Sequence, residues 1–286
     1  MTDPVTGYGH DLLFGVVLTP DAVNPGRTVD LALHAERTGL DLVSVSDHQY
    51  EPGFLDAWTL LSWIAAQTRR VSVMPNVANL LLRPPAGMAR AAASLDALSG
   101  GRVELGLGAG GHGHAIYSEG GPDATAGERI SAFTEAVRVI RALTAPGPPV
   151  TIDGQHHRLH QAMPGPPHPH PIGLWIGAVG PRMLRLVGHI ADGWISSATR
   201  IPPHELDAAN TRIDDAARAV GRDPSKIKRL YNIPAPPHAQ PGVWADQLAR
   251  IAIHHGISGF LLFSDDYETI SRFADDIAAR VRQAVT

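Results

Sequence analysis

The fold class is decided by residues 12–46, LLFGVVLTPDAVNPGRTVDLALHAERTGLDLVSVS. Two short apolar runs, at 12–18 and 41–46, are typical of strands that are buried on both faces. Between them lies a helical pattern at 27–37, which ends before Gly39 because glycine is favoured just beyond a helix C-terminus. The stretch therefore predicts a strand, a helix and a second strand, which is the repeating unit of a parallel sheet.

The same alternation continues along the rest of the sequence. Further strand-like runs occur at 71–74, 103–107, 172–176, 193–196, 227–232 and 259–263. Helical patterns follow the strands at 56–67, 85–98, 130–140, 181–190, 203–220, 243–255 and 267–284. Eight strand–helix units in 286 residues predict an α/β fold, and they fit a closed (β/α)8 TIM barrel better than an open, doubly wound sheet. The open sheet is the alternative, since periodicity alone does not distinguish the two.

One segment interrupts the alternation. Residues 146–171 contain eight prolines and five histidines, and a short hairpin is expected at 150–158, around Asp153 and Gly154. This composition predicts a long surface insertion after the fourth helix, with exposed histidines, and not a linker between domains. Residues 1–286 are therefore expected to form a single barrel domain.

Composition excludes several classes of protein. Lys and Arg number 24 against 28 Asp and Glu, a net charge of −4, so electrostatics do not favour nucleic acid or an anionic membrane as a partner. The sequence has no cysteine, which excludes disulfides and thiolate chemistry. The first residues do not resemble a signal peptide, and no apolar run approaches about 18 residues, so a cytoplasmic protein with no membrane segment is expected.

In a barrel, the active site lies on the loops that follow the carboxyl ends of the strands. Asp47 and His48 follow the second strand, and His48 could exchange a proton near neutral pH; the alternative is a helix cap and a structural histidine. The loop 177–182 after the fifth strand is glycine-rich and leads into a helix. Its free N–H groups favour an anion, with Arg182 or Arg200 as a further contact. A tight turn without a ligand is the alternative.

Two further patterns are weaker. Residues 106–111 match G-x-G-x-x-G, but a dinucleotide site needs a helix directly after it, and 112–127 are glycine-rich with no helical apolar face. His112 and His114, like the histidines of the insertion, suggest metal ligands. A metal site needs further ligands brought together in space, and we expect none here.

Four motifs follow one another along the chain: Ser46–Asp47–His48, Leu82–Arg83–Pro84–Pro85 ahead of an alanine-rich helix, SLDALSGGRVELGLGAG at 94–110, and WIGAVGPRMLRLVGHIADGW at 175–194. Together they resemble the bacterial luciferase-like monooxygenase superfamily over nearly the whole chain. The resemblance implies a (β/α)8 barrel with an insertion. It also implies a cofactor, either FMN or the 8-hydroxy-5-deazaflavin coenzyme F-420 (F420). The motifs are most similar to those of the F420-dependent branch.

The resemblance implies places for individual residues. Asp47 lies near the edge of the cofactor ring, and His48 lies near its reactive face and supplies a proton. A bulge at Pro75 and Asn76, which in the family often carries a non-prolyl cis peptide, backs the ring. The other expected cofactor contacts are Gly108, Gly110, Gly177, Ala178, Val179, Gly180, Pro181, Ser197 and Arg200.

One position departs from the family pattern. In the sugar-phosphate dehydrogenase type an acid follows the G-x-G at the end of the fourth strand, whereas this sequence has Gly111. His112 and His114 are the nearby candidates for proton transfer. His112 also matches a histidine of many monooxygenase-like members, and we expect it to be catalytic together with His48.

Three functions remain open at this stage. The first is an oxidoreductase that transfers a hydride between F420 and a small organic substrate. The second is an FMN-dependent monooxygenase that takes reduced flavin from a separate reductase and uses oxygen. The third is a flavin-binding family member without catalysis. A homodimer is expected by analogy with the family.

Overall fold

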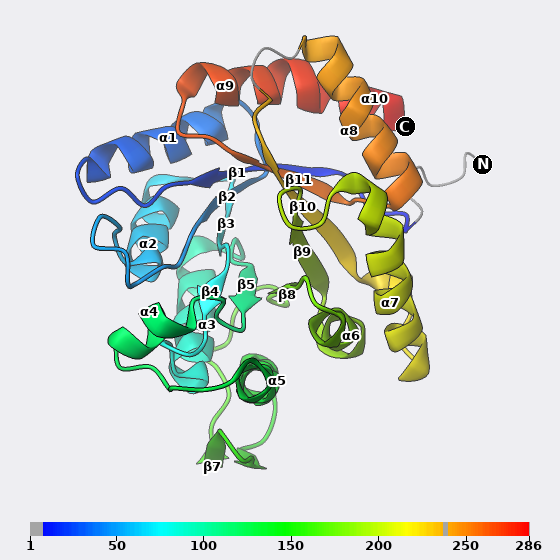
Figure 1. Ribbon diagram of the computed structural model, residues 1–286. Helices are drawn as coiled ribbons and strands as arrows, with labels where there is room; N and C mark the ends of the chain where they lie inside the picture. Colours follow the sequence, from blue (N-terminus) through cyan, green and yellow to red (C-terminus); the bar gives the residue numbers. More distant parts are fainter. Residues whose placement is uncertain (1–7, 237–239, 286) are drawn as a thin grey trace.

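The computed structural model describes residues 8–236 and 240–285 and shows a parallel sheet surrounded by helices (Figure 1). The sheet has nine strands in the order β3-β2-β1-β11-β10-β9-β8-β5-β4, and all its pairs are parallel. The strands are β1 (Leu13–Leu18), β2 (Leu42–Val45), β3 (Ser72–Pro75), β4 (Ala78–Asn79), β5 (Leu105–Gly108), β8 (Leu174–Gly177), β9 (Gly193–Ser197), β10 (Lys228–Pro234) and β11 (Gly259–Phe263). The predicted α/β class is confirmed.

Helices cover the outer face of the sheet in the predicted alternation (Figure 1). They are α1 (Pro25–Arg37), α2 (Ala57–Gln67), α3 (Pro85–Ser99), α5 (Ala126–Thr144), α6 (Pro181–Ile190), α7 (Leu206–Ala219) and α8 (Pro241–His255). The last helix runs without a break as expected, and it consists of α9 (Tyr267–Arg272), a π-helical turn at Phe273–Ala278 and α10 (Ala279–Val285). A 3-10 turn at Pro203–Glu205 precedes α7.

The sheet nearly closes into a barrel. β3 and β4 share the third strand position, because a bulge with a cis peptide bond between Asn76 and Val77 splits that strand. β4 pairs with β5. Hydrogen bonds from Val73 N to Arg102 O (2.8 Å) and from Glu104 N to Val73 O (3.1 Å) bring β3 against the start of β5. The prediction of a barrel is therefore confirmed, and the alternative of an open, doubly wound sheet is not.

The interior of the barrel is an apolar core. Its side chains are Val17, Leu42, Met74, Trp175, Ile195, Leu230 and Leu261. A larger apolar layer fills the space between strands and helices, so each strand is covered on both faces and forms a continuous apolar run in the sequence. Gly15 has no room for a side chain, since a Cβ there would lie 2.6 Å from Leu42 O.

The insertion contains the predicted hairpin, formed by the antiparallel strands β6 (Val150–Asp153) and β7 (Arg158–Ala162). The expectation of exposed histidines is wrong for His168, whose side chain is 9% exposed. Its ring nitrogens lie 2.6 Å from His170 O and 2.7 Å from the carbonyl oxygen of the last residue of α5. His170 Nδ1 lies 3.0 Å from the buried Asp96 carboxylate of α3. Two of these partners, the end of α5 and Asp96 of α3, lie outside the insertion, so its composition could not reveal them.

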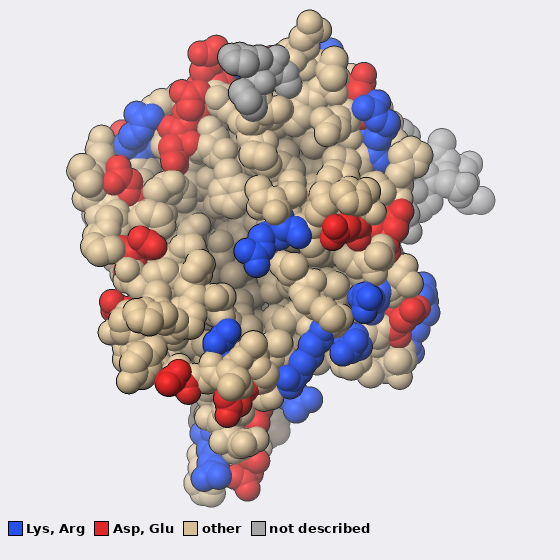
Figure 2. All heavy atoms as spheres, in the orientation of Figure 1, with Lys and Arg blue, Asp and Glu red and all other residues tan. Residues whose placement is uncertain are grey.

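A short helix, α4 (Gly113–Ser118), follows the glycine-rich run after β5. The expectation of no helix there is wrong, because Ile116 is buried and anchors this single turn and a half against the barrel. Figure 2 shows acidic and basic side chains interspersed over one face of the molecule, which is hollowed near its centre. Among the described residues, no helix has the length and apolar character needed to cross a membrane.

Candidate active site

A cavity of about 360 Å³ lies at the carboxyl ends of the strands, where barrel enzymes place their active sites. The predicted site residues that line it are Asp47, His48, Asn76, Gly108, Gly110, His112, Gly177, Ala178, Val179, Ser197 and Arg200. The lining residues outside the predicted set are Tyr50, Val77, Ala78, Asn79, Ala109, Gly111, Ile195, Ser196 and Asn232. The barrel thus brings together residues from six strand ends that are dispersed over most of the sequence.

Three predicted contacts do not line the cavity. Pro75 ends β3 just before the bulge, Gly180 is the N-cap of α6, and Pro181 is its first residue. Two of the unpredicted lining residues, Asn79 and Asn232, had a usable signal, because each is a polar residue near the end of an apolar strand. The sequence contains no such signal for Tyr50, since a tyrosine in a loop is compatible with many roles.

Aromatic rings gather at one side of the cavity. The His48 ring is stacked on Tyr50, with centroids 5.4 Å apart, and on Phe54 at 6.3 Å. The His112 ring meets His48 edge-on at 5.7 Å. The two histidines predicted to be catalytic therefore lie together, although one follows β2 and the other follows β5. No hydrogen bond to the His48 ring occurs among the described residues.

The surroundings of His48 decide its charge. Burial lowers the pKa of His48 and the nearby His112 lowers it further, while Asp47 and Glu51 act in the opposite direction. The ring is therefore neutral at pH 7 and can accept a proton. Burial raises the pKa of Tyr50, so its hydroxyl keeps its proton.

The carboxylate of Asp47 is engaged within the protein. Arg83 binds it with two hydrogen bonds of 2.7 Å, from Nε to Oδ2 and from Nη2 to Oδ1. The backbone N–H of Asn79 donates to Oδ2 at 3.0 Å. Burial lowers the pKa of Arg83, but hydrogen bonds and charge from Asp47 and Asp56 outweigh it and raise the pKa. Asp47 is thus a salt-bridged anchor of the wall and not a free base; its place near a cofactor ring stays a prediction.

The floor of the cavity is polar. Asn76 Nδ2 donates to Asn232 Oδ1 at 3.0 Å, and Asn232 Nδ2 donates back to Asn76 Oδ1 at 3.2 Å. The second N–H of Asn76 is 3.4 Å from the buried Ser44 hydroxyl. This pair of amides joins the bulge after β3 to β10, above the apolar interior of the barrel.

Of the two arginines predicted as anion contacts, Arg182 and Arg200, only Arg200 lines the cavity. α6 begins at Pro181, beside the wall formed by the end of β8, and no side chain caps its first N–H groups. Arg182 donates to two acceptors on α5, Gly127 O and Ser131 Oγ. Arg200 lines the cavity, and its guanidinium has no hydrogen bond or ion pair within the described part of the chain. Arg200 is therefore the cation available to an anionic ligand.

The residues of the cavity fit a flat ring with an anionic substituent. Glycines at the ends of β5 and β8 let Val77 pack closely against the wall, since a Cβ on Gly108 would lie 2.5 Å from Val77 Cγ2 and one on Gly177 would lie 3.4 Å from it. An apolar wall, an amide floor and a cation at the rim match the ring and the phosphate of a flavin-type cofactor.

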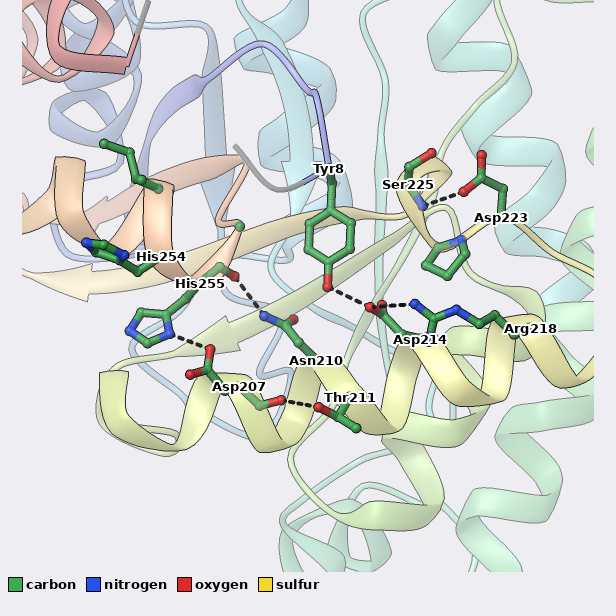
Figure 3. Close-up of a pocket in the computed structure, with 13 residues that line it drawn as sticks. Tyr8, Asp207, Asn210, Thr211, Asp214, Arg218, Asp223, Ser225, His254 and His255 are labelled. Atoms are coloured by element: carbon green, nitrogen blue, oxygen red, sulfur yellow. Dashed lines mark hydrogen bonds and ion pairs between the residues drawn. The ribbon is translucent and has the colours of Figure 1, made fainter. Parts of the chain in front are cut away.

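A second cavity, of about 630 Å³, lies beside α7 and α8 (Figure 3). Ser225, which lines it, precedes β10, so this cavity is at the amino ends of the strands, away from the barrel mouth. Its polar groups are paired with one another: Tyr8 donates to Asp214 at 3.0 Å, and His255 lies 2.6 Å from Asp207. We assign no ligand to it.

The nearly closed sheet, the mouth cavity and its two histidines define a (β/α)8-barrel enzyme. The chain belongs to the luciferase-like monooxygenase family, whose pattern matches residues 12–284. The resemblance seen in the sequence motifs is thereby confirmed.

The relatives of this chain include F420-dependent oxidoreductases. An F420-dependent glucose-6-phosphate dehydrogenase of Kineococcus radiotolerans is 30% identical over 238 residues, which are 80% of this chain and 69% of that protein. A 5,10-methylenetetrahydromethanopterin reductase of Archaeoglobus fulgidus is 31% identical over 217 residues, which are 73% of this chain and 59% of that protein. These names agree with the branch that the motifs indicate.

Solved structures share the fold at lower identity. An F420-dependent secondary alcohol dehydrogenase in complex with an F420–acetone adduct has a TM-score of 0.79 at 22% identity, covering 94% of this chain and 99% of that one. The EDTA monooxygenase of Chelativorans sp. BNC1 has a TM-score of 0.81 at 14% identity, covering 96% and 94%. An F420-dependent dehydrogenase and a monooxygenase thus share this fold.

Proposed function

We propose that the protein is an F420-dependent oxidoreductase that transfers a hydride between F420 and a small organic substrate. The observation that carries this proposal is the contact of His48 with His112 at the mouth cavity, in a chain similar at about 30% identity to F420-dependent dehydrogenases. When bound, F420 supplies the hydride chemistry, and the protein supplies binding and proton transfer.

Different side chains of the cavity bind the cofactor and transfer the proton. Val77 and the strand-end residues Gly177 to Val179 hold the ring, and Arg200 holds the anionic part of the cofactor. His48 accepts the hydroxyl proton of a substrate that is oxidised and returns it when the reaction runs in reverse. Its neutral ring suits this role. Because Gly111 stands where an acid serves the sugar-phosphate type, proton transfer falls to the histidines.

Cofactor titration tests the proposal. Purified protein is titrated with F420 and, separately, with FMN, while the cofactor fluorescence is followed. We expect saturable binding of F420 with at least tenfold lower Kd than FMN, and weaker binding of F420 by an Arg200→Ala variant. Preference for FMN, or binding of neither, would refute F420 dependence.

The alternative function is an FMN-dependent monooxygenase that depends on a separate reductase. The shared barrel of the EDTA monooxygenase supports it at the level of the fold. Tight binding of reduced FMN together with oxygen-dependent turnover would favour it. Binding of a cofactor without turnover on any donor or acceptor would favour a non-catalytic member.

We also propose that the chain acts as a single barrel domain in a cytoplasmic homodimer. An apolar outer face supports the dimer: α2 carries no charged residue, and Trp63 and Leu98 on α2 and α3 are 61% and 86% exposed. Light scattering after size exclusion should give twice the 30.4 kDa chain mass, and Trp63→Glu should give the monomer.

A further inference from the structure

Arg83 does not line the cavity, yet it contacts both ends of the loop that carries most of the clustered rings. This loop, residues 47–56, runs from the end of β2 to the N-cap of α2. The rings on it are those of His48, Tyr50 and Phe54. The loop therefore presents the proposed proton acceptor together with both side chains on which that ring is stacked.

One guanidinium joins the two ends of loop 47–56. At the first end it forms the two 2.7 Å bonds to Asp47, whose side chain is 1% exposed. At the second end its Nη2 also donates to Asp56 Oδ2. Asp56 is itself fixed to the helix, because its Oδ1 accepts from Thr59 N at 2.8 Å. Arginine suits such a double contact, since its donors lie in one rigid plane.

The position of the His48 ring depends on this loop. Within the described chain, stacking and edge contacts hold the ring, and no hydrogen bond does. Inside the loop the backbone is tightened by bonds from Glu51 N to His48 O (3.0 Å) and from Phe54 N to Glu51 O (2.9 Å). The part of the loop around Phe54 is also held by bonds from Ala22 N to Gly53 O (2.9 Å) and from Leu55 N to Pro20 O (2.7 Å). Opening the Arg83 contacts would therefore let the His48 ring move away from Phe54 and out of its stack.

We propose that Arg83 is a positioning residue, which closes loop 47–56 by binding Asp47 and Asp56 at once and so holds the His48 ring in its stack at the cavity. The inference rests on the role of His48 in the proposed function. Its test uses the cofactor-free protein, so that a failure of F420 binding and a failure of this inference are separate results.

Two variants open the loop. Asp56→Asn opens one end, because asparagine caps a helix as well as aspartate but loses the carboxylate oxygen that faces Arg83. Arg83→Met opens both ends. Arg90→Met is the matched control, since Arg90 is an exposed arginine of α3 that donates to Met163 O and lies outside this contact. Amide hydrogen exchange and the NMR titration of the His48 ring, identified by its loss in His48→Gln, are measured for each protein.

In Asp56→Asn and Arg83→Met we expect amides of loop 47–56 to exchange at least tenfold faster, while the rest of the barrel keeps its rates. The pKa of His48 should rise toward its ordinary value of about 6.5, since the ring loses its buried stack. Arg90→Met should match the parent protein. Unchanged loop exchange and an unchanged His48 titration in Asp56→Asn would overturn the proposal, whether or not Arg83→Met folds. Faster exchange spread evenly over the whole barrel would also overturn it, because that reports global destabilisation.

Discussion

Asn76 and Asn232 pair their side-chain amides across the mouth of the barrel, although 156 residues separate them in the sequence. Each amide donates one hydrogen bond to the other, so the bulge after β3 and the end of β10 are held at a fixed separation. A reciprocal pair of this kind is costly to break on one side only, because the remaining amide loses both hydrogen bonds of the pair.

Replacement of Asn232 by alanine should therefore destabilise the fold. We expect the free energy of unfolding to fall by about 1–3 kcal/mol, the cost of a buried polar group left without a hydrogen bond. Urea denaturation of the single variants and of the Asn76→Ala/Asn232→Ala double variant measures it. The double variant should lose less than the sum of the two single changes, and strictly additive losses would contradict the pairing.

The His48 ring should titrate below the ordinary histidine value. Burial and the neighbouring His112 both lower the pKa of His48, so the ring should stay neutral until the pH falls below about 6.5. His112→Gln should raise this pKa, because the second cause is removed while the polar bulk is kept. Proton NMR of the imidazole resonances between pH 4 and 8 checks both statements. If the pKa of His48 were the same in His112→Gln as in the parent protein, burial alone would lower it.

Glu104 should make the protein less stable as the pH rises through weakly acidic values. Burial raises the pKa of Glu104 to about 7, against the effects of Lys228 and of the Gly173 N–H. In the unfolded chain the same carboxyl loses its proton near about pH 4.3. Between these values the unfolded chain releases the proton first, so the fold loses stability as the pH rises, and the loss is complete above about 7.

The Glu104→Gln variant isolates this effect, since glutamine can still accept the 2.8 Å hydrogen bond from Gly173 N. The variant should gain stability relative to the parent protein between pH 5 and pH 8. Denaturant midpoints at the two pH values measure the gain. An equal difference between the two proteins at both pH values would show that Glu104 is charged in the fold throughout.

Gly108 at the end of β5 and Gly111 in the loop after it should respond differently to alanine. A Cβ on Gly108 would lie 2.5 Å from Val77 Cγ2 at the bulge, whereas nothing lies within 4 Å of a Cβ on Gly111. Gly108→Ala should therefore lower the thermal stability and weaken F420 binding, by roughly 1–3 kcal/mol of overpacking strain. Gly111→Ala should keep the parent melting temperature, and thermal unfolding with fluorescence titration compares the two. Equal effects of the two substitutions would contradict the close approach of Gly108 to Val77.

Part of the candidate site could be predicted from the sequence. Asp47, His48 and the run from Gly177 to Val179 were found because they directly follow strands, and barrel topology gathers strand ends at one face. Tyr50 was missed, because its role depends on stacking against rings that the sequence does not relate to it. Arg83 was noted as part of a motif, but its charge alone does not reveal that it binds two carboxylates at once.

The sequence by itself determined the alternation of strands and helices, which favoured a barrel over an open sheet, and its motifs indicated the family. Those features follow from local periodicity and from motifs that stay contiguous along the chain. Only the tertiary structure decided which residues meet. Asp47 is a salt-bridged anchor, while the ring of the next residue, His48, is stacked beside the cavity with no hydrogen bond to any described residue. The His168 side chain is 9% exposed within a proline-rich insertion. Burial and pairing are set by groups from distant segments, so they follow from the closure of the sheet and not from any local pattern.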